Sequence, residues 1–111
     1  MAVFFVISYI ITKPEEWKEI SKKIFQLFRE RREKYKMIKS IRFFMQDIGG
    51  QMLRSVHIEE FERYADLENY LITVEADEEM AKLHRQLMAT LDAGSIERFT
   101  WKDMLRSDWI E

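Results

Sequence analysis

Val3-Phe4-Phe5-Val6-Ile7-Ser8-Tyr9-Ile10-Ile11 is the stretch of this 111-residue sequence that decides the fold, because it is apolar at nearly every position. Successive side chains of a β-strand point to opposite faces, so a half-exposed strand alternates apolar and polar residues. This stretch does not alternate. We therefore expect a strand with both faces covered, one by the chain's own helices and the other by a second copy of the protein.

Length and composition predict one domain over residues 1–111. The sequence contains no cysteine, which excludes a disulfide framework, a zinc ribbon and a cysteine nucleophile. The first apolar run is too short to span a bilayer and has no basic residues before it, so we expect a cytoplasmic protein that does not bind membranes. A net charge of −2 argues against a dedicated nucleic-acid binder.

One segment concentrates positive charge and has two interpretations. It is either a solvated helix end, where the helix dipole favours cations, or an anion-binding patch. Glu30 and Glu33 interrupt it. Its basic residues are Arg29, Arg31, Arg32, Lys34, Lys36 and Lys39.

The spacing of apolar residues predicts the elements that follow the first strand. A stripe with steps of three and four predicts a helix over 14–35, preceded by Thr12 as a capping hydroxyl. Two β-like runs, 37–48 and 51–62, are separated by Gly49-Gly50, which predicts a hairpin with a two-residue loop.

A second helical region begins at Tyr64, breaks and restarts at 76–79, and ends near Asp92. The last strand is expected over 96–104, with Phe99 and Trp101 on one face and Arg98 on the other. The tail 105–111 contains Trp109 and Ile110, so we expect it to dock on its own domain or on a neighbour.

The element order β-α-β-β-α-β predicts an α+β, ferredoxin-like fold: a four-stranded antiparallel sheet with the helices on one face. The other face is bare and, from the first strand, apolar. Two such sheets packed face to face give a dimeric α+β barrel, so we expect a homodimer through the sheet faces.

A two-residue loop at Gly49-Gly50 sets a register in which Arg42 faces His57 and Phe43 faces Val56. The more apolar set, with Phe43 and Val56, should lie under the helices, although a one-residue slip would exchange the faces. The polar set then brings Arg42, His57 and Glu59 together.

Those three residues are the candidate catalytic group. A carboxylate beside an imidazole orients the ring and stabilises its positive charge, as a general base needs, and Arg42 could hold a developing enolate or phenolate. The alternative is an ion-pair network across the dimer seam, where buried charges must be paired.

Four further residues are candidates for ligand binding: His84, Trp17, Trp101 and Tyr9. His84 lies on an apolar helix face, where a core or cleft histidine is the competing interpretation. No second histidine lies at metal-ligand spacing, so we expect no metal and no cofactor. The three aromatic residues either line a pocket between helix and sheet or fill the core.

The segment from Val56 to Leu67, a strand running through a short turn into a helix that opens with Ala65, Asp66 and Leu67, resembles the dimeric α+β barrel superfamily. It is similar to the NIPSNAP-like and antibiotic-biosynthesis-monooxygenase-like branches. The superfamily includes cofactor-free monooxygenases acting on polycyclic phenols, isomerases and haem-degrading enzymes, so the resemblance implies a small aromatic or polycyclic ligand.

Three functions stay open from the sequence. The first is a small-molecule-binding homodimer with cofactor-independent monooxygenase or isomerase activity. The second is a non-catalytic dimeric interaction protein. The third is haem binding through His84, which lies where the haem-degrading branch has a histidine, although Asn69, the only asparagine, is on the wrong element.

Overall fold

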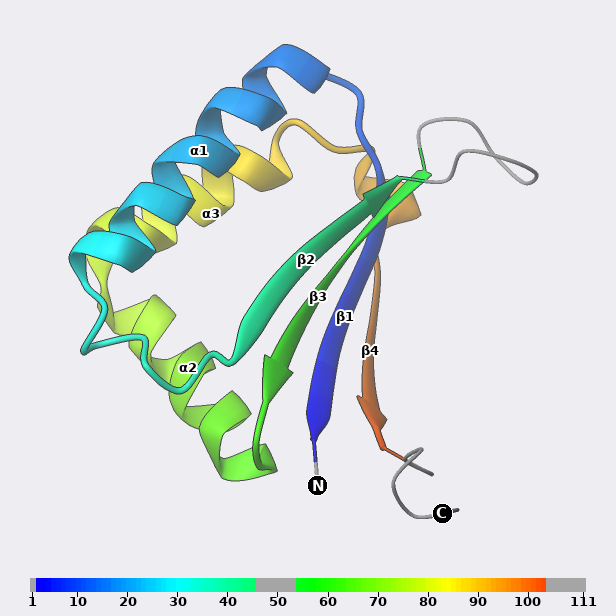
Figure 1. Cartoon of the computed structure of the whole chain (residues 1–111). Helices are drawn as coiled ribbons and strands as arrows, with labels where there is room; N and C mark the ends of the chain where they lie inside the picture. The colour runs from blue at the N-terminus through cyan, green and yellow to red at the C-terminus, as the bar shows by residue number, and fades with distance from the viewer. Residues whose placement is uncertain (1, 46–53, 104–111) are drawn as a thin grey trace.

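The computed structural model describes residues 2–45 and 54–103. In this part of the chain, four strands form one antiparallel sheet in the order β2-β3-β1-β4, and the helices lie on one side of it (Figure 1). The elements are β1 (Val3–Ile10), α1 (Pro14–Glu30), β2 (Ser40–Met45), β3 (Arg54–Phe61), α2 (Tyr64–Ala76), α3 (Glu78–Met88), the short 3-10 turn η1 (Ala93–Ser95) and β4 (Glu97–Lys102). The predicted ferredoxin-like α+β fold is confirmed.

The strand β1 is central, which explains why its sequence does not alternate. It pairs with β3 on one side and β4 on the other. Its odd-numbered side chains pack with the helices, and its even-numbered side chains face the other way. The first group is Val3, Phe5, Ile7 and Tyr9, and the second is Phe4, Val6, Ser8 and Ile10.

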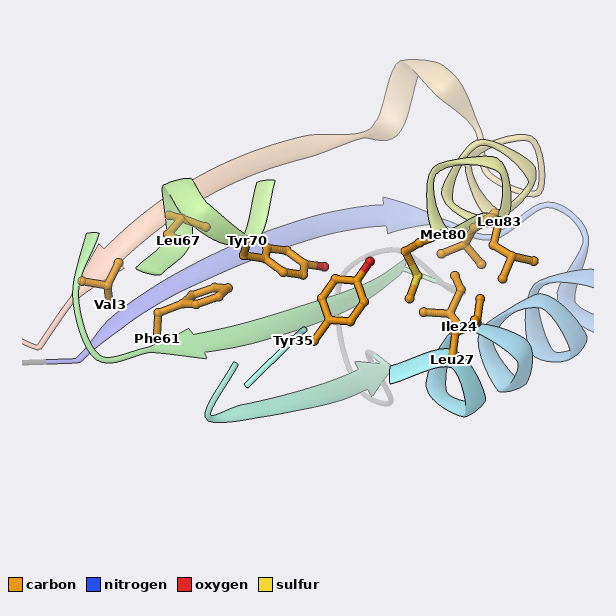
Figure 2. Close-up of a cluster of buried hydrophobic side chains, with 10 residues drawn as sticks. Val3, Ile24, Leu27, Tyr35, Phe61, Leu67, Tyr70, Met80 and Leu83 are labelled. Atoms are coloured by element: carbon orange, nitrogen blue, oxygen red, sulfur yellow. The ribbon is translucent and has the colours of Figure 1, made fainter. Parts of the chain in front are cut away.

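The core lies between the helices and the odd-numbered face of β1. One cluster joins the sheet to the three helices, as Figure 2 shows, and a second cluster continues it toward Leu91. Fully burying a large apolar side chain stabilises the fold by about 1.5–3 kcal/mol. The first cluster comprises Val3, Ile24, Leu27, Tyr35, Phe61, Leu67, Tyr70, Met80, Leu83 and Leu87.

The helix ends differ in part from their prediction. α1 begins at Pro14 but ends at Glu30 rather than near residue 35, and its N-cap is Lys13 rather than Thr12. The Thr12 hydroxyl instead donates to the Thr90 carbonyl (3.0 Å), so that side chain joins two connections rather than capping a helix. The predicted break at 76–79 is confirmed.

Asp77 occupies that break and holds several elements together. Its carboxylate accepts from the Met80 backbone N–H (3.3 Å), which caps α3, and from the Tyr35 hydroxyl (2.6 Å). Arg31 donates to it and Lys34 lies 3.5 Å away. The residues after α1 therefore turn to meet Asp77 instead of continuing the helix.

The predicted register of the hairpin is wrong by one residue. The structure pairs Phe43 with His57 and Arg42 with Ile58. Directly opposite residues share a face, so β3 presents His57 and Glu59 to the helices and Val56 to the other side, the reverse of the expectation. The cause is the pairing of β3 with β1, which sets Ile7 opposite His57.

The predicted Gly49-Gly50 loop and the docking of the tail 105–111 lie outside the described residues.

The face away from the helices, which we call the outer sheet face, carries an apolar group. It comprises Phe4, Val6, Ile10, Phe44, Val56, Ile58, Phe99 and Trp101. At its centre Val6 is 1% exposed, whereas Phe44 and Trp101 near its edges are 43% and 53% exposed.

Among the described helices, none is long and apolar enough to cross a membrane.

Candidate functional site: a cavity between the helices and the sheet

A cavity of about 340 Å3 lies between the three helices and the sheet. Its walls are mostly apolar, with Phe5 and Ile7 on β1, Phe43 on β2, and Phe25 and Phe28 on α1 among them. A hollow of a few hundred Å3 with apolar walls and a few polar groups is the usual form of a small-molecule site.

The sheet wall of the cavity carries a buried pair of polar side chains. His57 and Glu59 project from β3 and are 8% and 4% exposed. His57 Nε2 lies 3.3 Å from Glu59 Oε1, and the Tyr9 hydroxyl lies 3.4 Å from His57 Nδ1. Burial raises the pKa of Tyr9 to about 12, so this hydroxyl keeps its proton.

The partners fix the tautomer of a neutral His57. A carboxylate oxygen only accepts, so His57 Nε2–H donates to Glu59. Nδ1 then carries the lone pair and accepts from the Tyr9 hydroxyl. The result is a chain of hydrogen bonds from Tyr9 through His57 to Glu59.

Two buried polar atoms at the cavity wall have no hydrogen-bond partner among the described residues: Glu59 Oε2 on β3 and Ser21 Oγ on α1. A buried polar atom left unpaired costs about 1–3 kcal/mol, so such atoms indicate a missing partner. Burial raises the pKa of Tyr70 well above its ordinary value, and the charge of the Glu59 carboxylate and a hydrogen bond to it act in the same direction. Glu59 thus keeps a buried acceptor oxygen in the cavity wall, and the Tyr70 hydroxyl is a donor close to it.

Other polar side chains line the cavity from α3 and β4. His84 donates from Nδ1 to the Met80 carbonyl (2.8 Å), which leaves Nε2 with its lone pair when the ring is neutral. Arg98 projects from β4 toward α3, with Nη2 3.9 Å from Met88 Sδ, and forms no salt bridge within the described residues. In the same part of the chain, no three His, Cys, Asp or Glu side chains form a group that could hold a metal ion.

The structure brings together His57, Glu59 and His84 of the predicted site residues, with Tyr9 directly behind His57. Arg42 and Trp101 do not join them, because both lie on the outer sheet face. The Arg42 guanidinium lies over the Phe44 ring there, 5.1 Å from its centroid.

Trp17 has a packing role instead. Its ring meets Phe43 edge to face at 5.6 Å, and it contacts both core clusters without lining the cavity. The interpretation of Trp17 as core is therefore the better one.

Two arginines that sequence reasoning missed line the cavity, Arg85 on α3 and Arg98 on β4. The signal for Arg98 was present, because the alternation of β4 sets it on the face opposite Phe99 and Trp101. Once those aromatic residues are assigned to the outer sheet face, Arg98 must face the helices.

Tyr9→Phe tests the hydrogen-bond chain. Removing the hydroxyl leaves buried His57 Nδ1 without a donor, so we expect a loss of about 1–2 kcal/mol in the free energy of unfolding. We also expect the NMR signal of the His57 ring nitrogens to move. Tyr64→Phe, at an exposed tyrosine, is the control and should change stability by less than about 0.5 kcal/mol. Equal stabilities for the two variants would contradict the Tyr9–His57 bond.

No family model and no curated protein matches the chain. Solved structures do. A variant of SnoaB, a cofactor-independent oxygenase from Streptomyces nogalater, is 13% identical with a TM-score of 0.71 and 96% of each chain covered. A dimeric ferredoxin-like protein from an uncultured marine organism is 12% identical with a TM-score of 0.69, covering 95% of this chain and 96% of that one.

Two further similar structures represent the two branches that the sequence resembles. A protein from Bordetella bronchiseptica described as a putative antibiotic biosynthesis monooxygenase is 8% identical with a TM-score of 0.68, covering 94% of this chain and 98% of that one. A NIPSNAP family protein of unknown function from Agrobacterium tumefaciens is 12% identical with a TM-score of 0.67, covering 92% and 87%. The chain shares the ferredoxin-like α+β fold of these structures. At these identities the likeness concerns the fold alone.

Proposed function

We propose that the cavity binds a small aromatic molecule with an acidic C–H or O–H group, and that the Glu59–His57 pair removes this proton. The observation that carries the proposal is the buried His57–Glu59 pair in the cavity wall, in which Glu59 Oε2 has no hydrogen-bond partner among the described residues. His57 holds the other carboxylate oxygen through Nε2–H, so the pair is oriented before the ligand arrives. Arg98, which lines the same cavity, supplies positive charge for the enolate or phenolate that forms.

The reaction that we favour is oxygenation without a cofactor. Loss of a proton from a ring methylene group to Glu59 leaves a delocalised carbanion. Dioxygen adds to this carbon, a proton returns to give a hydroperoxide, and loss of water leaves a carbonyl group. In sum, the methylene group and one dioxygen molecule give one carbonyl group and one water molecule. The similarity in fold to SnoaB, described as a cofactor-independent oxygenase, supports this choice.

An isomerase would use the same first step and return the proton to another carbon of the ligand. The two activities are separated by oxygen uptake. An anthrone, an aromatic ketone with an acidic ring methylene, is a suitable probe because its anion is stabilised by the rings. In heavy water without oxygen, we expect the protein to accelerate exchange of the methylene protons. With oxygen present, we expect one dioxygen molecule to be consumed for each anthrone converted.

Exchange without enzyme-dependent oxygen uptake would favour an isomerase. Absence of both, with the probe bound, would favour a binding or interaction protein without catalysis. Absence of binding would remove the cavity from consideration as the site.

We also propose that the protein is a homodimer that covers the outer sheet face. The apolar group on that face is too extended to leave in water, and two of the similar structures are described as dimeric. Location in the cytoplasm stays a prediction from the sequence.

Trp101→Glu tests the dimer. The charge would lie within an apolar interface, so we expect the variant to be a monomer at micromolar concentration by light scattering while the wild type is a dimer. Ile72→Glu is the control, since Ile72 is 65% exposed on α2. A monomeric wild type, or a variant that stays dimeric, would overturn this interface.

A further inference from the structure

The basic segment at the end of α1 contains two arginines that form no salt bridge with the residues that the structure describes. The other four basic residues form salt bridges. Arg31 pairs with Asp77 and Glu79, and Lys34 also pairs with Asp77. Lys36 pairs with Glu33, and Lys39 pairs with Glu62. Within the described residues, no salt bridge occupies Arg29 or Arg32. In the described ranges 2–45 and 54–103, carboxylates thus pair with the neighbours of these two arginines but not with the arginines themselves.

Arg29 and Arg32 line a second hollow of about 430 Å3, which we call the α1-end groove. Lys36 lines it too, and among the described residues no acidic side chain does. Its apolar side is made in part by Phe25, Phe28 and Ile41.

The groove adjoins the cavity of the candidate site. Phe25, Phe28 and Ile41 line both hollows, so these half-buried side chains form the wall that the two share. A ligand whose apolar body lies in the cavity could therefore reach the arginines with a short alkyl linker that lies against these three side chains.

From this arrangement we propose that the ligand is an amphipathic acid, with its aromatic body in the cavity and its carboxylate bound by Arg29 and Arg32 in the α1-end groove. The inference rests on the proposed function, because it takes the cavity as the ligand site. A guanidinium matches a carboxylate with two parallel hydrogen bonds, and a charged pair of this kind is about twice as strong as a neutral hydrogen bond.

The competing explanation is a solvated helix end. Arg29 lies in the last turn of α1, where the helix dipole favours a cation without any ligand. That explanation accounts for the positive charge, but it does not account for a groove in which two arginines without a described salt-bridge partner lie next to the apolar wall of the cavity. It also predicts no preference between a charged ligand and its neutral analogue.

The test is a matched pair of fluorescent probes, 6-(2-naphthyl)hexanoic acid and 6-(2-naphthyl)hexan-1-ol, which differ only in the end group. For the wild type at low salt we expect the acid to bind about tenfold more tightly than the alcohol. The preference should decrease as salt is added, because ions screen exposed charges. In Arg29→Gln/Arg32→Gln the preference should disappear while the affinity for the alcohol stays unchanged.

Lys13→Gln/Lys18→Gln is the control, since it removes the same charge from exposed positions at the start of α1. It should keep the preference for the acid. Arg98→Gln should also keep the preference for the acid. If Arg98→Gln loses this preference, the carboxylate binds at the cavity wall and the proposed anion site in the α1-end groove is wrong. Equal binding of both probes by the wild type would overturn the anion site but leave the cavity proposal standing. Binding of neither probe would overturn both.

Discussion

Glu59→Gln should lower the rate of anthrone methylene exchange in heavy water at least ~100-fold and leave the fold intact. The amide has nearly the shape of the carboxylate but does not accept a proton, and loss of a general base typically costs a factor of about 10² to 10⁴. Glu59 is buried on a central part of the sheet, and its Oε2 is the unpaired oxygen at the cavity wall. The measurement is NMR exchange without oxygen, together with circular dichroism to verify folding.

Glu60→Gln is a matched control on the same strand. Glu60 is the next residue along β3 and points to the outer sheet face, so its substitution should not change the exchange rate. His57→Gln should lower the rate less than Glu59→Gln does, because His57 orients the carboxylate and is not the first proton acceptor. Exchange that survives Glu59→Gln but is abolished by His84→Gln would move the base to α3 and contradict this assignment.

Asp77→Ala should have the largest effect on stability, a loss of about 3 kcal/mol in the free energy of unfolding at pH 7. The substitution removes the cap of α3 and leaves Tyr35, Arg31 and Lys34 without their shared acceptor. Chemical denaturation measures the loss. Glu79→Ala is the control, because Glu79 contacts the same Arg31 from an exposed position and should contribute less than about 1 kcal/mol. Similar losses for both variants would contradict the central role of Asp77.

The same carboxylate predicts how stability depends on pH. Burial alone would raise the pKa of Asp77, but the hydrogen bonds from Tyr35, Arg31 and the Met80 N–H hold it well below its ordinary value. A carboxyl whose pKa is lowered by folding stabilises the folded state above its unfolded pKa, and this contribution is lost as the pH falls toward the folded pKa. Below about pH 4, the wild type should therefore lose stability more steeply than Asp77→Asn.

Local patterns were sufficient to predict the elements and the fold. The helix break at 76–79 could be predicted because Asp77, Glu78 and Glu79 form a helix start, and the structure has that cap. The end of α1 could not, because its stripe of apolar residues continues to Tyr35. The chain turns there because Arg31, Lys34 and Tyr35 all contact Asp77, which lies 42 positions beyond Tyr35.

The candidate site was predicted in part for a similar reason. His57 and Glu59 share a face at any register, because they are two positions apart on one strand. The sequence therefore predicts that His57 and Glu59 belong to one site. It does not predict which arginine lies on the same face of the sheet. A one-residue difference in hairpin register separates Arg42 from them, and the position of β4 at the sheet edge brings Arg98 to the cavity instead.

The sequence by itself determined a central strand with two apolar faces, and hence a layered α+β domain, since hydrophobic periodicity depends only on neighbours along the chain. Only the tertiary structure decided which polar residues face the helices. That choice is made by the pairing of β3 with β1, a contact between segments far apart in the chain, and local spacing contains no information about it.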